Sequence, residues 1–442
     1  MLKRVSEYTD ASGAAVPIRD ASFPAPFPSG LEYGSPARGT WNIVHTGMLI
    51  PGAHQIFVCA AGCLRGVVLT AAEMNAMDRF STVAIRENNV LDGDMEELII
   101  DGVSDILQKL PELPPAVLVY TSCIHHFMAC DLPRVYGELR KRFPAVAFTD
   151  CYMNPIMRKS GLTPDQIMRK QLYSLLEKRP LNPKAVNLLG SDLRTFDSCE
   201  MLRTLRENGY TFREITRCKT YAEYQEMAEA AVNLSTSPAA AAGGEALEKR
   251  LGAKHLYLPF CFDSAGIEKD MDLLCKTLEI PRPDLSADRE RAETALSAAF
   301  RVIGQTPVAI DYTLSDRPLG LARLLTEHGF AVESVYLDSI SGEEKDDYRW
   351  LQTHVPALLL RATNRPKMRV LERTHEGDLL ALGQKAAYFT GTQNFVNIVE
   401  DGGLYGYDGI ARLSALMTDA MVTEKDTRSL IQIKGLGCGC CV

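Results

Sequence analysis

Cysteine thiols are the side chains of this sequence with the clearest capacity for chemistry. The stretch "IFVCAAGCLRG" (56–66) places Cys59 and Cys63 four positions apart, and "VYTSCIHHFMACD" (119–131) places Cys123 directly after an apolar run. Thiolates are the ligands of iron–sulfur clusters, but free cysteine is also among the most buried core residues. Spacing alone leaves both interpretations open.

Twelve cysteines are more than core packing requires in a chain of 442 residues. The first residues, "MLKRVSEYTD", contain no apolar segment of the kind found in secretory signals, so we expect a cytoplasmic protein. Cytoplasmic thiols stay reduced, which favours metal binding or catalysis over disulfides. Several of the twelve are still expected to be ordinary core residues.

The charge and hydropathy of the chain exclude two classes of partner. The net charge is −8 at pH 7, so the chain lacks the basic surface of a nucleic-acid-binding protein. No run of about 18 uncharged apolar residues occurs, and Arg65 interrupts the best candidate. We therefore expect neither a nucleic acid nor a membrane as partner.

Cationic and titratable residues beside the cysteines could tune a bound metal centre. Iron–sulfur clusters carry negative charge, which nearby cations and N–H groups stabilise, and Arg65, His125 and His126 are placed to supply them. We interpret His125 as a candidate proton donor, with a supporting or surface role for both histidines as the alternative. The histidines do not complete a compact zinc-binding set with the cysteines.

Nucleotide-binding motifs are absent from the sequence. There is no G-x-x-x-x-G-K-[ST] loop, and no helix follows the glycines of "GLGCG" (435–439). If the chemistry needs ATP or a nicotinamide, we expect another protein to handle it.

The elements that must position these residues are short apolar strands alternating with helices. Such a rhythm is typical of βαβ units, in which both faces of a parallel sheet are covered. The predicted strands include 116–122, 145–150, 185–191, 230–237, 307–313, 356–363 and 386–392. The charged run at 341–350 is predicted to start a solvated helix.

The number of these units predicts an α/β fold with three Rossmann-like layers and parallel sheets. The predicted domains are an extended arm at 1–40, a cysteine-bearing domain at 41–178, a second at 179–303 and a third at 304–415. Residues 416–442 are expected either to pack back onto the first domain or to be flexible.

Four stretches, in order, resemble the nitrogenase component 1 family, which includes nitrogenase subunits, cofactor-assembly homologues and dark-operative protochlorophyllide reductase subunits. They are "CAAGCLRG" (59–66), "IRENNVLDGDMEELI" (85–99), "VYTSCIHHFMACDL" (119–132) and "GLYGYDGIARLSALM" (403–417). The most specific feature is the interval of 60 positions between Cys63 and Cys123. The resemblance spans residues 40–420.

By this resemblance, Cys63 and Cys123 are ligands of an iron–sulfur cluster, of the 4Fe–4S type or larger. Family members usually carry a further cysteine upstream, where this chain has "YGSPARGT" (33–40) without a thiol. Cys59 is the first candidate to replace it. His45, His54 or a partner subunit are the alternatives.

The resemblance also shows departures from catalytic nitrogenase subunits, which anchor their large cofactor with one cysteine and one histidine. Here the corresponding places read "NLSTSP" (233–238), with no thiol, and Tyr405 in "GLYGYDG". Tyr405 is therefore expected to face whatever occupies the cofactor or substrate site, without anchoring a metal as histidine does. Reduction of dinitrogen is not expected.

The resemblance implies an oxidoreductase component that works as a homodimer, or as a heterodimer with a homologous chain. Low-potential electrons would come from a separate P-loop ATPase iron protein and pass to an unidentified substrate. A non-catalytic scaffold for metallocofactor assembly is the alternative, and a cluster-free protein with buried thiols is a third. The tail cysteines Cys438, Cys440 and Cys441 could bind metal or be incidental.

Overall fold

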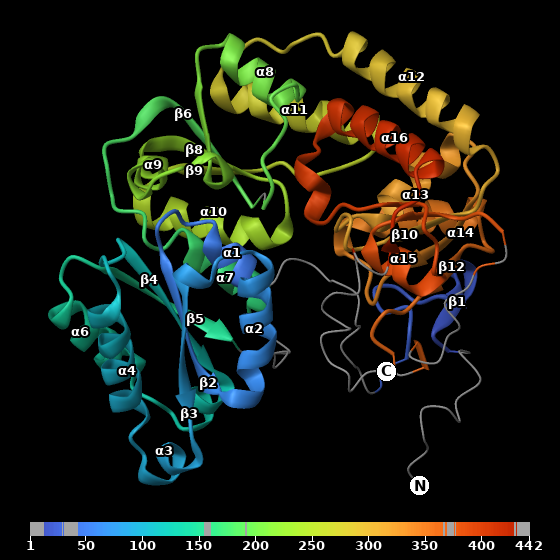
Figure 1. Ribbon diagram of the computed structural model, residues 1–442. Coiled ribbons are helices and arrows are strands. Elements are labelled where there is room, and N and C mark those ends of the chain that lie inside the picture. The colour runs from blue at the N-terminus through green and yellow to red at the C-terminus, as the bar shows by residue number, and fades with distance from the viewer. Residues whose placement is uncertain are drawn as a thin grey trace, which may run out of the picture. The chain divides into compact units, whose positions relative to one another are not determined.

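The structure is a computed structural model that describes most of the chain (Figure 1). The described residues are 13–28, 30, 43–153, 161–190, 192–365, 367–368, 375, 377–427 and 430. They form three sheets dominated by parallel strands, which confirms the predicted α/β class. The chain divides into two compact units: residues 41–194 with 205–259, and residues 1–40 with 195–204 and 260–442. The boundaries predicted for three separate domains stay a prediction.

The first sheet lies in the unit that contains residues 41–194, and all its strands are parallel. Its order is β3 (Phe80–Ile85), β2 (His54–Ala60), β4 (Ala116–Ser122) and β5 (Ala147–Met153). All seven residues of β4 are buried, as expected for a strand covered on both faces.

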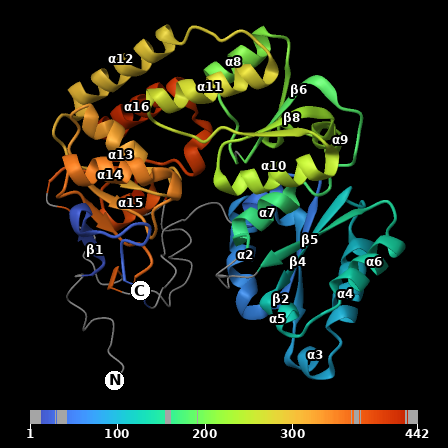
Figure 2. The same cartoon turned by 180° about the vertical axis from the view of Figure 1, so that it is seen from behind.

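Helices cover both faces of this sheet, α2 (Ala61–Glu73) on one and α4 (Met95–Lys109) with α6 (Leu132–Arg142) on the other (Figures 1 and 2). Side chains alternate between two cores along each strand. Phe57, Cys59 and Tyr120 belong to the core that includes α2 residues. Ile56, Val58 and Val119 belong to the core that includes α4 and α6 residues.

The second sheet lies in the same unit and is also fully parallel. Its order is β7 (Thr211–Glu214), β6 (Asn182–Leu189), β8 (Ala230–Ser235) and β9 (Lys254–Tyr257). Helix α10 (Pro238–Leu251) follows β8 and crosses α7 (Pro164–Leu172) closely. A Cβ added at Gly243 would lie 3.2 Å from the carbonyl oxygen of Arg169, a tight contact, so glycine allows the two helices to approach closely there.

The third sheet lies in the other unit and has one antiparallel edge. Its order is β1 (Ala15–Pro17), β12 (Leu359–Arg361), β11 (Val332–Tyr336), β10 (Val308–Asp311), β13 (Leu380–Leu382) and β14 (Phe395–Val396). Residues Ala15–Pro17 of the predicted arm therefore form a strand that pairs antiparallel with β12.

The strand predicted at 386–392 is wrong, because these residues fall mainly in helix α15 (Gln384–Thr390). Every residue of α15 is buried, and its apolar run at 386–389 shows no helical period. A short apolar run of this kind does not distinguish a strand from a buried helix. The backbone N–H of Ala386 donates to Asp311 at 2.6 Å, which fixes the start of the helix beneath β10.

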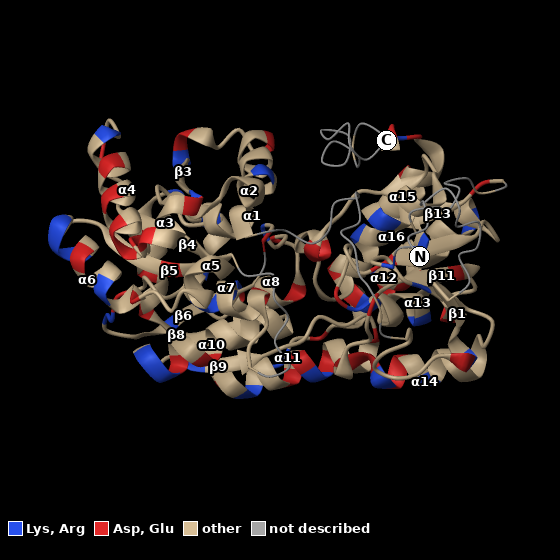
Figure 3. Cartoon of the chain, turned by 90° about the horizontal axis from the view of Figure 1, so that it is seen from below, with Lys and Arg blue, Asp and Glu red and all other residues tan. Residues whose placement is uncertain are grey.

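The remaining helices complete the two units. They are α1 (Ile43–Met48), α3 (Glu87–Asp92), α5 (Cys123–Phe127), α8 (Glu200–Glu207), α9 (Tyr221–Glu226), α11 (Ser264–Leu278), α12 (Ser286–Ile303), α13 (Pro318–Glu327), α14 (Lys345–His354) and α16 (Gly406–Val422). Helix α14 confirms the prediction at 341–350. Charges of both signs lie along α4 and α6 (Figure 3), joined by ion pairs such as Arg142 to Asp101 at 2.9 Å.

Glu344 holds the amino end of α13 in the unit that contains the third sheet. Its carboxylate accepts the backbone N–H groups of Leu319 at 2.6 Å and Gly320 at 3.2 Å. Burial raises the pKa of Glu344 to about 8, although these two hydrogen bonds oppose the shift.

The free energy of unfolding should fall less steeply with rising pH in Glu344→Gln than in the wild type. Between the unfolded pKa of about 4.3 and the folded pKa, the folded state retains a proton that the unfolded state releases, so the wild-type stability falls. One proton corresponds to about 1.4 kcal/mol per pH unit, while glutamine accepts the same N–H groups without titrating. Denaturant titrations of both proteins at pH 5.5 and 7.5 measure the difference. Identical pH slopes would contradict the buried, protonated carboxyl.

Candidate functional site

The carboxyl edge of the first sheet brings the predicted cysteines together. In the sheet, β2 lies between β3 and β4. The chain runs from β2 to β3 in one direction and then continues with β4 and β5 in the other, so the strand order reverses between β2 and β4. Ligands of open α/β sheets bind beyond the carboxyl ends of strands at this reversal. Cys63 is the third residue of α2, which follows β2, and Cys123 is the first residue of α5, which follows β4.

The three candidate thiols are neighbours but differ in exposure. Cys63 is exposed, Cys123 is partly exposed and Cys59, inside β2, is fully buried. The pKa of the Cys59 thiol is raised to about 12, first by burial and then by negative charge on Cys63 and Cys123. The last two causes place the Cys63 and Cys123 sulfurs each within electrostatic reach of Cys59.

The start of α2 suits a negatively charged group. Its N-cap residue, Ala60, supplies no side-chain hydrogen bond, so the first N–H groups of the helix are not capped by that side chain. Aligned peptide dipoles also make a helix amino end positive. A Cβ added at Gly62 or at Gly66 would meet no atom within 4 Å, so the surface beside Cys63 is open.

His125 fixes the backbone around Cys123. Its Nδ1 accepts the backbone N–H of Ser122 at 3.0 Å, so the neutral ring carries its proton on Nε2. The ring is 2% exposed, and burial lowers its pKa, which keeps it neutral. Its Nε2 has no hydrogen-bond partner among the described residues, and the carboxylate that acts on it is Glu96.

The other predicted residues are more scattered. Arg65 is exposed on α2. His126 is also exposed, and its ring lies 6.2 Å from that of Phe127. His54 begins β2 and hydrogen-bonds Ser81 at 2.8 Å, so it lies at the opposite end of the strand from Cys63. The tail cysteines Cys438, Cys440 and Cys441 lie outside the described residues.

Hydroxyl groups replace the expected thiol after β8, and each has a local structural role. Ser235 hydrogen-bonds His255 at 2.7 Å, and the Ser237 hydroxyl accepts the backbone N–H of Ala240 to cap α10. These side chains serve the fold of their own unit and provide no soft metal ligand.

Tyr405 lies in the other unit, where it is the N-cap residue of α16. The turn that follows it is held by Glu200, which accepts the backbone N–H of Tyr407 at 2.6 Å. Gly406 has φ +61°, and a Cβ there would lie 1.8 Å from the Glu200 carboxylate. The Gly-Tyr-Asp-Gly sequence is thus explained by a buried carboxylate that binds the helix start.

Within the described part of the chain, no three His, Cys, Asp or Glu side chains form a set that could hold a metal ion. Cys59, Cys63 and Cys123 are thus not part of such a set within the ranges that the structure describes. Two accessible thiols beside a positive helix end fit part of a cluster's ligand set. Four cysteines are the usual set for a 4Fe–4S cluster.

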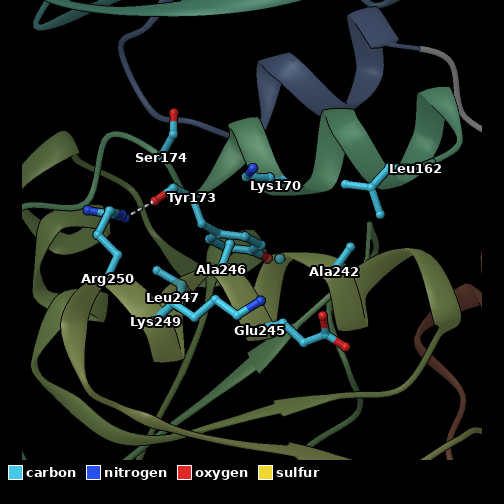
Figure 4. Close-up of a pocket in the computed structure, with 11 residues that line it drawn as sticks. Leu162, Lys170, Tyr173, Ser174, Ala242, Glu245, Ala246, Leu247, Lys249 and Arg250 are labelled. Atoms are coloured by element: carbon cyan, nitrogen blue, oxygen red, sulfur yellow. Dashed lines mark hydrogen bonds between the residues drawn. The ribbon is translucent and has the colours of Figure 1, made fainter.

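A separate cavity of about 430 Å³ lies between α7 and α10 (Figure 4). Lys170, Glu245 and Lys249 lie around it, while Arg250 is held by the carbonyl oxygens of Tyr173 at 2.7 Å and Leu176. The charged side chains at its rim are those of solvated helix surfaces, and none of the predicted site residues lines it.

Comparison with known proteins decides the family. The family described as nitrogenase component 1 type oxidoreductase matches residues 44–421. The chain belongs to this family. A search of curated proteins finds no match.

Solved structures show the component 1 fold. A structure described as nitrogenase Cp1 at pH 6.5 has a TM-score of 0.67 at 15% identity, covering 89% of this chain and 94% of that one. A second, nitrogenase Cp1 at pH 5, has a TM-score of 0.61 at 14% identity, covering 93% and 94%. The predicted resemblance and fold class are confirmed.

Membership of the component 1 family has chemical implications. The family consists of oxidoreductases, typically binds iron–sulfur clusters, and typically pairs with homologous chains and an iron protein. Among the described residues no helix is long and apolar enough to cross a membrane.

Sequence reasoning missed two acids near Tyr405. Glu200 begins α8 far from position 405, and nothing in its local sequence indicates that contact. Asp270 is among the buried residues of α11, and its negative charge contributes to the raised pKa of Tyr405, after burial. An acid at an apolar position of a helical pattern is the signal in the sequence that marks Asp270.

Proposed function

We propose that this chain is an iron–sulfur oxidoreductase component that receives low-potential electrons from an ATP-dependent iron protein and reduces an unidentified substrate. The observation that carries the proposal is the pair of accessible thiols, Cys63 and Cys123, on either side of the strand-order reversal. Family membership supports the electron donor.

Cys63 and Cys123 are the proposed ligands. Cys59 is a buried core residue beside them and is not proposed as a ligand. A thiol must lose its proton to bind iron. Burial raises the pKa of Cys59, so its thiol loses the proton less readily than an accessible thiol does. Two thiols from each of two chains would complete the four-cysteine set of a 4Fe–4S cluster. The cluster would then be shared by two chains.

Exposed apolar side chains around the two thiols favour such a partner chain. Phe127 is 70% exposed, and Leu69 and Met128 are also exposed, on or directly after the helices that carry the thiols. Apolar patches of this kind mark protein interfaces. A second, homologous chain would bury them and exclude water from the cluster.

Dinitrogen is not the proposed substrate. Ser235, Ser237 and Tyr405 stand where a thiol and an imidazole would anchor the large nitrogenase cofactor, and both serines are engaged within the fold. The substrate would therefore be bound without that anchor.

The proposed role is tested by electron transfer. Anaerobically purified protein, mixed with a reduced iron protein of a related system and MgATP, should show a reduced-cluster paramagnetic resonance signal that does not form when ADP replaces ATP. No nucleotide-dependent reduction of a cluster-loaded protein would contradict the role as electron acceptor.

The missing anchors also favour a second candidate, a scaffold that carries a metallocofactor during assembly. A scaffold releases its cargo to an acceptor apoprotein without turnover, whereas an oxidoreductase keeps its iron while it consumes electrons. Iron retained by the chain after incubation with an apo-acceptor separates the two roles.

A further inference from the structure

The third sheet has a strand-order reversal of its own. From β10 the chain continues with β11 and β12 on one side and then with β13 and β14 on the other, so the order reverses between β10 and β13. All these strands are parallel, and open α/β sheets bind ligands beyond the carboxyl ends of strands at such a reversal. Tyr312 directly follows β10, and Lys385 lies three residues after β13, in the first turn of α15.

Tyr312 and Lys385 are joined by a short hydrogen bond. Lys385 Nζ donates to Tyr312 Oη at 2.6 Å and to Thr363 Oγ1 at 3.4 Å, and it lies 4.7 Å from the centroid of the tyrosine ring. Thr363 follows β12, and its hydroxyl donates in turn to the partly exposed carboxylate of Asp338. The four side chains therefore form one hydrogen-bonded network beyond the carboxyl ends of the strands.

Lys385 is a buried cation whose hydrogen-bond acceptors are both neutral. The lysine is 6% exposed, and the groups that accept its N–H bonds are the hydroxyls of Tyr312 and Thr363. A buried charge is normally paired with an opposite charge, because its removal from water costs free energy that hydroxyl groups recover only in part. The retention of a lysine here points to a chemical use.

Two acids lie near the same strand ends, but other donors satisfy them. Asp311 accepts the backbone N–H groups of Thr313 at 2.7 Å and Ala386 at 2.6 Å. Burial raises the pKa of Asp311, and the charge of the lysine is the smallest of the influences that oppose this shift. Asp338 accepts both the backbone N–H of Thr363, at 2.8 Å, and its hydroxyl. Neither acid replaces the hydroxyls as the lysine's hydrogen-bond acceptor.

Two donors of this network have no acceptor among the described residues. The ammonium group of Lys385 has three N–H bonds, of which the structure pairs two. The Tyr312 oxygen accepts one of these, so the tyrosine's own hydrogen points away from the lysine, and the tyrosine is partly exposed. The two donor atoms are 2.6 Å apart. They can therefore converge on a single acceptor atom of a bound molecule.

We propose that Tyr312 and Lys385 bind and protonate the acceptor atom of the reducible group in the substrate of this chain. The substrate class is a small molecule with a polar multiple bond, whose oxygen or nitrogen gains negative charge as electrons arrive. Preorganised donors aimed at such a developing charge stabilise the transition state. The electrons come from the iron protein, so this inference rests on the proposed function.

Each one-electron step is balanced by one proton from the network. The substrate gains the electron, the Tyr312 O–H bond breaks as its proton moves to the acceptor atom, and the Lys385 ammonium passes a proton to the phenolate oxygen. Water then returns a proton to the amine through Asp338 and the Thr363 hydroxyl. Until that transfer, the buried positive charge beside the tyrosine oxygen stabilises the phenolate, because the local dielectric constant is low.

The first test needs neither a cluster nor the natural substrate. Thiocyanate, a small anion that accepts hydrogen bonds, should bind to the full chain, and its C≡N stretching band in the infrared distinguishes bound from free anion. Tyr312→Phe and Lys385→Met should each weaken binding about fivefold or more, through the loss of one hydrogen bond. Lys276→Met removes an exposed lysine of α11 in the same unit and should bind as the wild type does.

Folding should not limit this comparison, because phenylalanine and methionine keep the size of the side chains they replace. Exchange of a buried charge for an apolar group of similar volume is often neutral for stability, which denaturation midpoints of the variants check. No thiocyanate bound to the wild type, or equal binding by all four proteins, would overturn the donor pair.

The second test measures proton donation during turnover, with nitrite as the probe substrate. One electron and two protons convert nitrite to nitric oxide and water. Iron-loaded wild type with reduced iron protein and MgATP should catalyse this reaction, and Tyr312→Phe and Lys385→Met should each lose about tenfold or more in rate at saturating nitrite. Methylamine should restore part of the rate to Lys385→Ala and none to Tyr312→Phe, a rescue that a merely structural lysine would not show.

The outcomes separate this inference from the proposed function. Wild-type rates in both variants would overturn the proton-donating role, and so would an iron-loaded wild type that reduces no nitrite. A wild-type protein without iron would sink the proposed function, while the thiocyanate result would still decide whether the donor pair exists.

Discussion

Cys63→Ser and Cys123→Ser are each expected to remove most of the iron from protein purified without oxygen. A serine hydroxyl stays protonated near neutral pH and is a poor ligand for iron compared with a thiolate. If each chain supplies two thiolates, one substitution per chain halves the protein ligands of a shared cluster. Metal analysis and paramagnetic resonance measure the loss, which should exceed about tenfold.

Folding should not limit this experiment. Cys63 is exposed and Cys123 partly exposed, so their replacement should change the unfolding free energy by about 0.5 kcal/mol or less. Cys59→Ala is the matched control at the same strand end, because it removes a buried thiol and should retain the cluster. A full cluster in both serine variants would disprove the assignment of Cys63 and Cys123.

Gly406→Ala is expected to destabilise the protein more than any other glycine-to-alanine substitution in the unit that contains α16. The new Cβ would lie 1.8 Å from the Glu200 carboxylate, at φ +61°. Relief of the clash would break the hydrogen bonds from Tyr407 at 2.6 Å and Asp408 at 3.3 Å, leaving a buried carboxylate unsatisfied. The sum of strain and lost pairing is about 3–5 kcal/mol.

Gly329→Ala is the matched control for this substitution. Gly329 lies in the same unit with φ +84°, but a Cβ there meets only the Phe300 ring at 3.5 Å, an ordinary contact. It should cost about 1 kcal/mol, from backbone strain alone. Equal midpoints of denaturation for the two variants would show that Glu200 does not hold the start of α16.

Buried parallel strands were the most predictable part of the fold. The β4 run "AVLVYTS" is apolar because both faces are covered, and its observed bounds, Ala116–Ser122, match the prediction. The same property misled at 386–392, where α15 is buried on all sides and its apolar run resembles a strand. A short apolar run in the sequence indicates that a segment is buried, but it does not distinguish a strand from a helix.

The part of the site that follows the ends of parallel strands could be predicted from the sequence. Cys63 and Cys123 follow strands that parallel pairing brings together at one edge, so their convergence follows from the βαβ rhythm. The contacts of Glu200 with Gly406 and with the backbone N–H of Tyr407 join segments far apart in the sequence. They depend on how α8 and α16 pack, which local pattern does not encode.

Iron and acid-labile sulfide content of the wild-type protein, purified without oxygen, is the most direct test of the claim that accessible thiolates of two chains share one cluster. Two thiols per chain in a four-cysteine set predict about two iron atoms and two sulfides per chain, in a dimer by light scattering. A colourless protein with no stoichiometric iron would contradict the claim.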